Sequence, residues 1–367
     1  MAIIKYLSYK KFRIISAEKS ILMWGAGKLG IYYAQSMCEG LDILGFVDDD
    51  EKKWGDSIYV NNISYPIMGK TKAEEILKED KDLLNSIIIF VSPTAYAKEI
   101  VDEINNMKIF DNTECFLGIL IRDYYEPQIF EFTEGRQKIP KKIHYCWFGG
   151  NEIPEHLRLY MDSWKKYAPE YEIIRWDESN YDVKKNRYMR EAYESKAWGF
   201  VPDYARLDII YNEGGIYLDT DVELLASPNP LLNDDMFCGF QGNFVINLGC
   251  GFGAVKGHPL IKEMRDYYDD QVFIMPNGNY NTKTCYEYQH PIFLKKGFSL
   301  EDSYQKSNGL VIYPSEVLAP SRGMISKCYT EKTISIHHQE FSWASEAEKK
   351  AWDDFCISLK TKIYYTY

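Results

Sequence analysis

The feature that most constrains this fold is a short apolar run, residues 21–24, that leads directly into Gly25-Ala26-Gly27-Lys28-Leu29-Gly30. Helical residues follow the glycines, and a second apolar run over residues 41–47 ends in Asp48-Asp49-Asp50. A third run, residues 87–91, precedes another helical segment over residues 96–105. Strands that alternate with helices predict a small parallel sheet that is covered by helices on both faces.

The glycine-rich turn invites two interpretations. Gly25, Gly27 and Gly30 match G-x-G-x-x-G between a strand and a helix, and Asp48 ends the next strand. In this setting the pattern is typical of a dinucleotide-binding turn, in which backbone approaches a pyrophosphate and the acid binds a ribose hydroxyl. The segment from Gly45 to Asp50 resembles the small N-terminal Rossmann-like domains of bacterial sugar-modifying enzymes. There the loop either binds a nucleotide-like ligand or only shapes the fold, and we expect a structural or regulatory role.

Composition narrows the functional classes. Of the 367 residues, 46% are hydrophobic and 26% charged, and the formal net charge is −11, which disfavours binding to nucleic acid. The eight cysteines form no C-x-x-C pair, so we expect neither a zinc site nor a disulfide framework, and a cytoplasmic location fits. No apolar run approaches the roughly 18–20 residues that span a bilayer. Residues 4–14 and 360–367 mix basic with apolar or aromatic residues, which predicts either solvated segments or a peripheral contact with anionic lipid.

A polar stretch near residues 128–142 marks a domain boundary. We assign residues 1–135 to a Rossmann-like domain and residues 136–367 to a second α/β domain. The second domain is predicted to contain strands at 142–148, 171–176 and 216–218, and helices at 155–167 and 196–212.

An acidic pair follows the last of these strands. Alternation along a strand places the carboxylates of Asp219 and Asp221 on one face, with Thr220 on the other. Two hard oxygen ligands suit Mg²⁺ or Mn²⁺, which act as Lewis acids on a departing diphosphate. Because such pairs are common on protein surfaces, the alternative is a pair of solvated carboxylates.

Three separated segments extend this interpretation. Residues 201–221 (VPDYARLDIIYNEGGIYLDTD), 139–150 (IPKKIHYCWFGG) and 335–343 (SIHHQEFSW) resemble the motifs of glycosyltransferase family 32. That family includes bacterial capsule and O-antigen transferases, yeast mannosyltransferases and the catalytic domains of clostridial glucosylating toxins. The resemblance implies a GT-A fold for the second domain and a retaining, metal-dependent transfer of a hexose from a UDP-sugar.

The resemblance also implies roles for individual residues. Asp219, Asp221, Arg206 and Asp203 would form the catalytic set, and Asp219, Asp221 and His338 would hold the metal. The donor would contact Trp147, Asp203, Arg206, Tyr217, Asp219, Ser342 and Trp343. We also expect Gln241 or Asn247 to place an amide near the anomeric carbon.

The acceptor would be a glycan, and we expect it to be linked to polyprenyl diphosphate at the inner face of the bacterial plasma membrane, as in capsule or O-antigen synthesis. Two other functions compete with this one. An NAD-dependent sugar dehydrogenase or epimerase would use the loop from Gly25 to Gly30 and would need a Tyr-x-x-x-Lys or comparable acid/base set beside a full dinucleotide-binding sheet. The spacing from Tyr6 to Lys10 precedes the glycine-rich turn, and we find no second nucleotide-binding half in residues 1–130. A non-catalytic sugar-binding protein would have lost the acidic pair, which is intact here.

Overall fold

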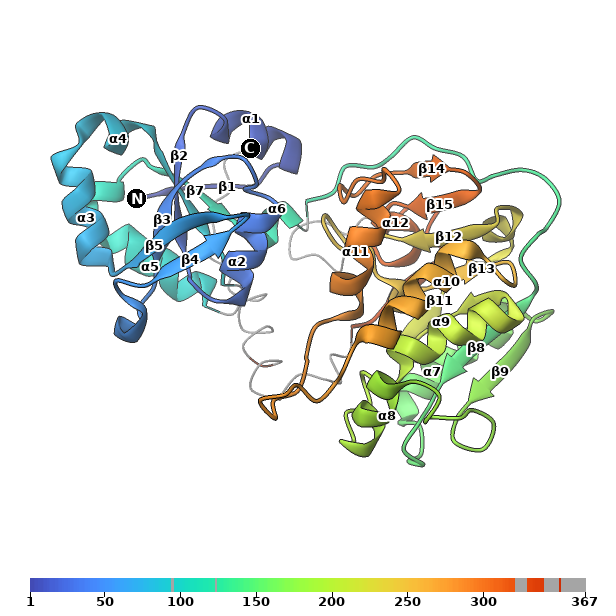
Figure 1. Ribbon diagram of the computed structural model, residues 1–367. Helices are drawn as coiled ribbons and strands as arrows, with labels where there is room; N and C mark the ends of the chain where they lie inside the picture. Colours follow the sequence, from blue (N-terminus) through green and yellow to red (C-terminus); the bar gives the residue numbers. More distant parts are fainter. Residues whose placement is uncertain (94–95, 123, 321–328, 340–349, 351–367) are drawn as a thin grey trace. The chain divides into compact units, whose positions relative to one another are not determined.

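The structure, a computed structural model, describes residues 1–93, 96–122, 124–320, 329–339 and 350 (Figure 1). The chain divides into two compact units, and the second begins at Pro127, just before the polar stretch near residues 128–142 and upstream of the predicted start at residue 136. Each unit is built on its own seven-stranded sheet. The predicted class is therefore confirmed: a small parallel-sheet α/β unit precedes a second α/β unit.

The first unit contains a sheet in the order β1-β7-β6-β2-β3-β5-β4, in which β4 is antiparallel to β5 and the other pairs are parallel. The strands are β1 (Ile3–Lys5), β2 (Ser20–Trp24), β3 (Asp42–Val47), β4 (Ser57–Val60), β5 (Ile63–Met68), β6 (Ile87–Val91) and β7 (Glu114–Leu117). The helices are α1 (Tyr9–Ser16), α2 (Lys28–Gln35), α3 (Lys70–Glu79), α4 (Lys81–Ser86), α5 (Ala97–Asn106) and α6 (Gly118–Arg122).

The central position of β2 and β6 follows from their sequences. All five residues of β6 are buried, as are four of the five in β2, because a parallel strand between two layers of helices has no solvated face. From β2 the chain moves outward to β3, then crosses back to β6 and β7, so right-handed crossovers place helices on opposite faces of the sheet.

The N-terminal segment packs on its own unit. Residues Ile3–Lys5 extend the sheet as β1, and Phe12 of α1 is fully buried against Phe90 and Phe116. The apolar side chains that a lipid contact would need are thus partly used inside the protein. In the described part of the chain, no helix combines the length and apolarity needed to cross a membrane.

The second unit contains a mixed sheet in the order β14-β15-β12-β13-β10-β8-β9 and a two-stranded sheet of β11 and β16. The strands are β8 (Lys142–Cys146), β9 (Glu172–Trp176), β10 (Gly215–Tyr217), β11 (Val222–Leu224), β12 (Met236–Gly239), β13 (Phe252–Ala254), β14 (Gln305–Ser307), β15 (Leu310–Tyr313) and β16 (Ser335–His337). The helices are α7 (Glu155–Tyr167), α8 (Arg187–Glu194), α9 (Pro202–Glu213), α10 (Pro259–Asp266), α11 (Cys285–Lys295) and α12 (Ser315–Leu318).

Helix α9 leads into β10, an interior strand of the sheet between β13 and β8. The predicted helix over residues 196–212 starts too early, because Pro202 occupies the first turn of α9, where its missing N–H costs nothing. Gly214 ends the helix at a φ of +67°, and a Cβ there would lie 2.8 Å from the Lys256 nitrogen. The residues from Asp203 to Ile210 are all buried, so α9 is a core helix.

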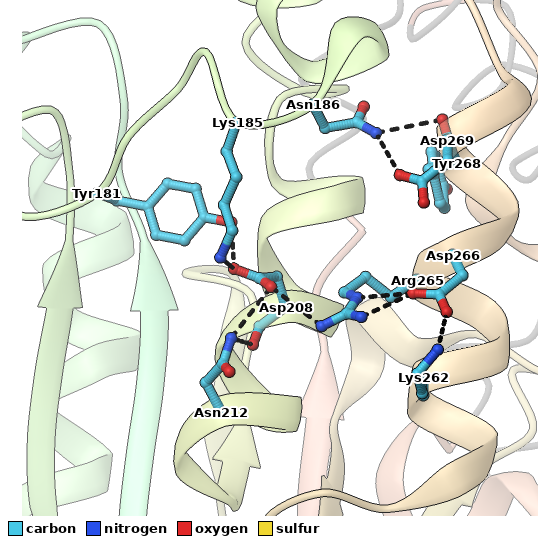
Figure 2. A network of polar contacts seen from close by, with 10 residues as sticks. All are labelled: Tyr181, Lys185, Asn186, Asp208, Asn212, Lys262, Arg265, Asp266, Tyr268 and Asp269. Carbon is cyan, nitrogen blue, oxygen red and sulfur yellow. Dashed lines mark hydrogen bonds and ion pairs between the residues drawn. The ribbon is translucent and has the colours of Figure 1, made fainter.

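A buried polar network fixes α9 against its neighbours (Figure 2). The carboxylate of Asp208, 2% exposed, accepts hydrogen bonds from Tyr181 and Asn212 and forms ion pairs with Lys185 and Arg265. These partners come from the loop before α8, from α9 itself and from α10. Because a buried carboxylate is stable only with such partners, the network fixes the position of α9.

Candidate metal centre beyond strand β10

The acidic pair lies in a turn rather than on a strand. Strand β10 ends at Tyr217, and Asp219 and Asp221 follow in the turn to β11, closed by a 3.1 Å bond from the Val222 N–H to the Asp219 carbonyl. Our explanation by strand alternation is therefore wrong. The carboxylates still converge, because the turn brings ligand atoms of Asp219, Asp221 and His337 within 4.8 Å of one another.

The structure brings His337, and not His338, to the acids. Strands β11 and β16 pair antiparallel with Val222 opposite His337, whose Nε2 lies 3.3 Å from Asp221 Oδ1. The next side chain points away: His338 Nε2 lies 2.8 Å from Glu223 Oε2, and its ring stacks on Tyr160. His337 therefore replaces His338 in the candidate metal centre.

Asp203 and Arg206 join this cluster from α9, as their helical spacing predicts. The Arg206 guanidinium lies 3.2 Å from Asp203 Oδ1 and 3.5 Å from Asp219 Oδ2, and it also donates to the Pro202 carbonyl. It packs over the ring of Tyr217, whose hydroxyl donates to Asp219 Oδ1 at 3.1 Å. Tyr217 is almost fully buried, so it holds Asp219 in place.

Burial controls the protonation of these groups. It raises the pKa of Asp203 to about 7, although the Arg206 charge acts in the opposite direction, and it raises the pKa of Asp219 in the same way. Burial alone would lower the pKa of His337, but the carboxylates of Asp221 and Asp219 raise it above its usual value. The carboxyl groups together can therefore carry more negative charge than the Arg206 guanidinium balances, and a divalent cation would neutralise the excess. Two carboxylates and an imidazole form a suitable donor set for such an ion.

Gln241 and Asn247 lie beside this cluster. Gln241 Oε1 accepts a 2.5 Å hydrogen bond from Asn247 Nδ2 and lies 3.2 Å from Nδ1 of His337. Asn247 Oδ1 in turn accepts the backbone N–H of Gly249 at 2.8 Å. Gly249 leaves no room for a side chain, because a Cβ there would lie 2.5 Å from Asp219 Oδ2.

The remaining residues that we expect to contact the sugar donor are Trp147, Ser342 and Trp343. Trp147 directly follows β8, the neighbour of β10, and its half-buried indole donates to the Asn151 carbonyl. Ser342 and Trp343 lie outside the described residues.

In the first unit, the loop from Gly25 to Gly30 has the conformation that its glycines predict. Gly25 has a φ of +102°, and a Cβ on Gly30 would overlap the Gly25 carbonyl. Asp48 is engaged within the protein: its carboxylate accepts the Ala26 N–H at 2.8 Å and pairs with Lys53 at 3.0 Å. A cavity of about 450 Å³ adjoins the loop, lined in part by Trp24, Gly25, Asp48 and Tyr96. Since Asp48 already ties the loop together, these contacts favour a structural role for it.

Comparison with known proteins identifies a glycosyltransferase region within the second unit. Residues 154–238 match the family model described as "Glycosyltransferase sugar-binding region containing DXD motif". The chain is 30% identical over 154 residues to inositol phosphoceramide mannosyltransferase 3 of Schizosaccharomyces pombe, covering 39% of this chain and 40% of that protein. It is 28% identical over 130 residues to subversion of eukaryotic traffic protein A of Legionella pneumophila, covering 28% of this chain and 19% of that protein. The chain thus spans less than half of either relative.

Among solved structures, a glycosyltransferase involved in the glycosylation of the major capsid of PBCV-1 is 15% identical, with a TM-score of 0.31, and the match covers 59% of this chain and 99% of that one. UDP-D-quinovosamine 4-dehydrogenase from Vibrio fischeri is 20% identical, with a TM-score of 0.21, and the match covers 27% and 76%. On the sequence match, the second unit carries a glycosyltransferase sugar-binding region with its D-x-D motif at residues 219–221.

Proposed function

We propose that this chain is a metal-dependent glycosyltransferase that transfers a hexose from a UDP-sugar to a glycan acceptor with retention of configuration. One observation carries the proposal: Asp219, Asp221 and His337 converge within 4.8 Å at the end of β10, inside the matched family's D-x-D region or packed against it. Three such groups in a half-buried cluster are costly unless a cation binds them.

Each residue of the site has a task in such a transfer. Asp219, Asp221 and His337 would hold a divalent cation, which stabilises the charge that develops on the departing nucleoside diphosphate. The mixture of carboxylates and an imidazole favours Mn²⁺ over Mg²⁺, because Mg²⁺ prefers oxygen ligands alone. Arg206 keeps Asp219 in place and adds a fixed positive charge beside the site, while Asp203 holds Arg206.

The donor would enter along the edge of the sheet where β8 and β10 end. Trp147 follows β8 on this edge, and a half-buried indole suits stacking against the uracil ring. Asp203 and Tyr217 are too buried to contact the donor without rearrangement, so we assign them to positioning. The acceptor proposed from the family resemblance, a lipid-linked glycan of capsule or O-antigen synthesis at the inner membrane face, is part of this proposal.

The test combines binding with turnover. We expect UDP to raise the thermal unfolding temperature only when Mn²⁺ is present, and Asp221→Ala to abolish both this shift and the hydrolysis or transfer of UDP-hexoses. Asp162→Ala is the matched control, because it removes an exposed carboxylate of α7 whose ion pair among the described residues is with Lys165 alone. If Asp221→Ala left the response to Mn²⁺ and the turnover intact, the proposal would be wrong. Stabilisation by NAD alone would instead favour a dehydrogenase.

A further inference from the structure

A chain of hydrogen bonds connects a backbone amide to the histidine of the candidate metal centre. It runs from the Gly249 N–H to Asn247 Oδ1, from Asn247 Nδ2 to Gln241 Oε1, and from Gln241 Oε1 to His337 Nδ1. The three distances are 2.8, 2.5 and 3.2 Å. At its far end, His337 Nε2 faces Asp221 at 3.3 Å.

The Gly249 N–H determines which atom donates and which accepts in each of these hydrogen bonds. A backbone N–H can only donate, so the atom of Asn247 that faces Gly249 must be the carbonyl oxygen, and its amide nitrogen must face Gln241. That nitrogen also can only donate, so Gln241 must present its oxygen. An amide oxygen can only accept, and the facing ring nitrogen of His337, Nδ1, must therefore carry the proton.

We infer that Gln241, oriented by Asn247, is a positioning residue that fixes His337 in the Nδ1–H tautomer and so presents the Nε2 lone pair to the divalent cation. The inference rests on the metal site of the proposed function and adds a residue that acts through a ligand. A ligating imidazole needs this support, because an unrestrained ring exchanges tautomers and rotates away from the metal. In this role Gln241 Oε1 is engaged by His337 and Asn247, so we assign it to the support of His337 instead of to the anomeric carbon.

The loop geometry suits this role. The Phe240–Ile246 bridge closes a short hairpin, Gln241 and Asn247 directly follow the two bridged residues, and the Gln241 N–H donates to the Val245 carbonyl at 2.7 Å. Both side chains therefore leave one rigid loop, beside β16, which carries His337. A rigid support costs little entropy when the metal binds.

Two variants of Gln241 distinguish the effect of its hydrogen-bond acceptor from the effect of its side-chain volume. Gln241→Leu has nearly the same volume but lacks the acceptor, whereas Gln241→Glu retains an oxygen that accepts the Nδ1–H bond. We expect Gln241→Leu to weaken Mn²⁺ binding by about 10–100-fold in isothermal titration calorimetry, as loss of such a support does elsewhere. Gln241→Glu should bind close to the wild-type affinity.

Gln289→Leu is the matched control. Gln289 is a 1% exposed glutamine of α11, and its side-chain nitrogen and oxygen have no hydrogen-bond partner among the described residues, so its replacement should leave Mn²⁺ affinity unchanged. A second readout needs neither metal nor activity: long-range ¹H–¹⁵N spectra of the full chain should show His337 protonated at Nδ1 in the wild type. The signal is assigned by its loss in His337→Asn.

The outcomes distinguish this inference from the proposed function. Wild-type binding of Mn²⁺ with unchanged affinity in Gln241→Leu would overturn the inference and leave the metal site standing. A metal-free wild type that lacks a proton on Nδ1 of His337 would overturn it as well, even if Gln241→Leu fails to fold. Absence of Mn²⁺ binding by a wild type that shows the Nδ1–H tautomer would refute the metal site itself.

Discussion

The hydrogen bonds of His144, on the strand next to β10, predict how the stability of the second unit depends on pH. His144 of β8 is fully buried, with Nε2 2.9 Å from the Gly214 carbonyl and Nδ1 3.1 Å from the Trp176 indole nitrogen. The carbonyl needs a donor and the indole N–H needs an acceptor, so the ring must be neutral with its proton on Nε2. The His144 carbonyl also accepts the Leu218 N–H, just before the acidic pair.

The magnitude follows from the pKa. The pKa of His144 is lowered from 6.5 to about 4, and burial is the largest cause of this shift. As pH falls, the unfolded chain takes up a proton first, so stability is intact above pH 6.5 and is lost between pH 6.5 and about 4. At about 1.4 kcal/mol for each pH unit, the total loss is about 3 kcal/mol, of which about 2 kcal/mol is lost by pH 5.

His144→Gln isolates this contribution. Glutamine keeps a donor for the Gly214 carbonyl and cannot be protonated, but it loses the acceptor for Trp176, which costs about 1 kcal/mol at pH 7.5. We therefore expect the wild type to be more stable at pH 7.5 and the variant to be more stable near pH 5. Urea unfolding at several pH values measures the difference, and groups common to both proteins cancel. His290, whose pKa burial also lowers to about 4, is one of these groups. Parallel stability curves for the two proteins would refute the reasoning.

Three shorter predictions concern the same unit. Gly249→Ala should weaken Mn²⁺ binding about tenfold or more in calorimetry with an unchanged circular dichroism spectrum, because its Cβ displaces the Asp219 carboxylate; equal affinity would contradict this. Asp208→Asn should lower the free energy of unfolding by about 2 kcal/mol in urea titrations, since the buried Asp208 side chain loses its charge-assisted hydrogen bonds to Lys185 and Arg265, and a loss below about 0.5 kcal/mol would contradict it. Thr284→Ala should cost about 1 kcal/mol in the same assay through loss of the capping box of α11, whereas an unchanged midpoint would argue against it.

Much of the fold was predictable because its elements coincide with strong local patterns. The apolar run at 87–91 and the amphipathic segment at 155–167 have the bounds of β6 and α7, since burial on both faces or on one face leaves a clear signature. The start of α9 was missed because the apolar pattern continues upstream, while Pro202 decides where the helix begins. The order of strands in the second sheet depends on long-range pairing and has no local signature.

The candidate site shows the same division between local and long-range information. Asp203 and Arg206 are one helical turn apart, so their pairing follows from the sequence, and the short separation of Asp219 and Asp221 keeps them together whether they lie on a strand or in a turn. His337 and His338 are different, because adjacent side chains on a strand point to opposite faces. Which of them meets the acids depends on the register of β16 against β11, fixed where Val222 pairs with His337. A shift of one residue would exchange the two imidazoles, so the choice between them required the pairing of strands more than 100 residues apart.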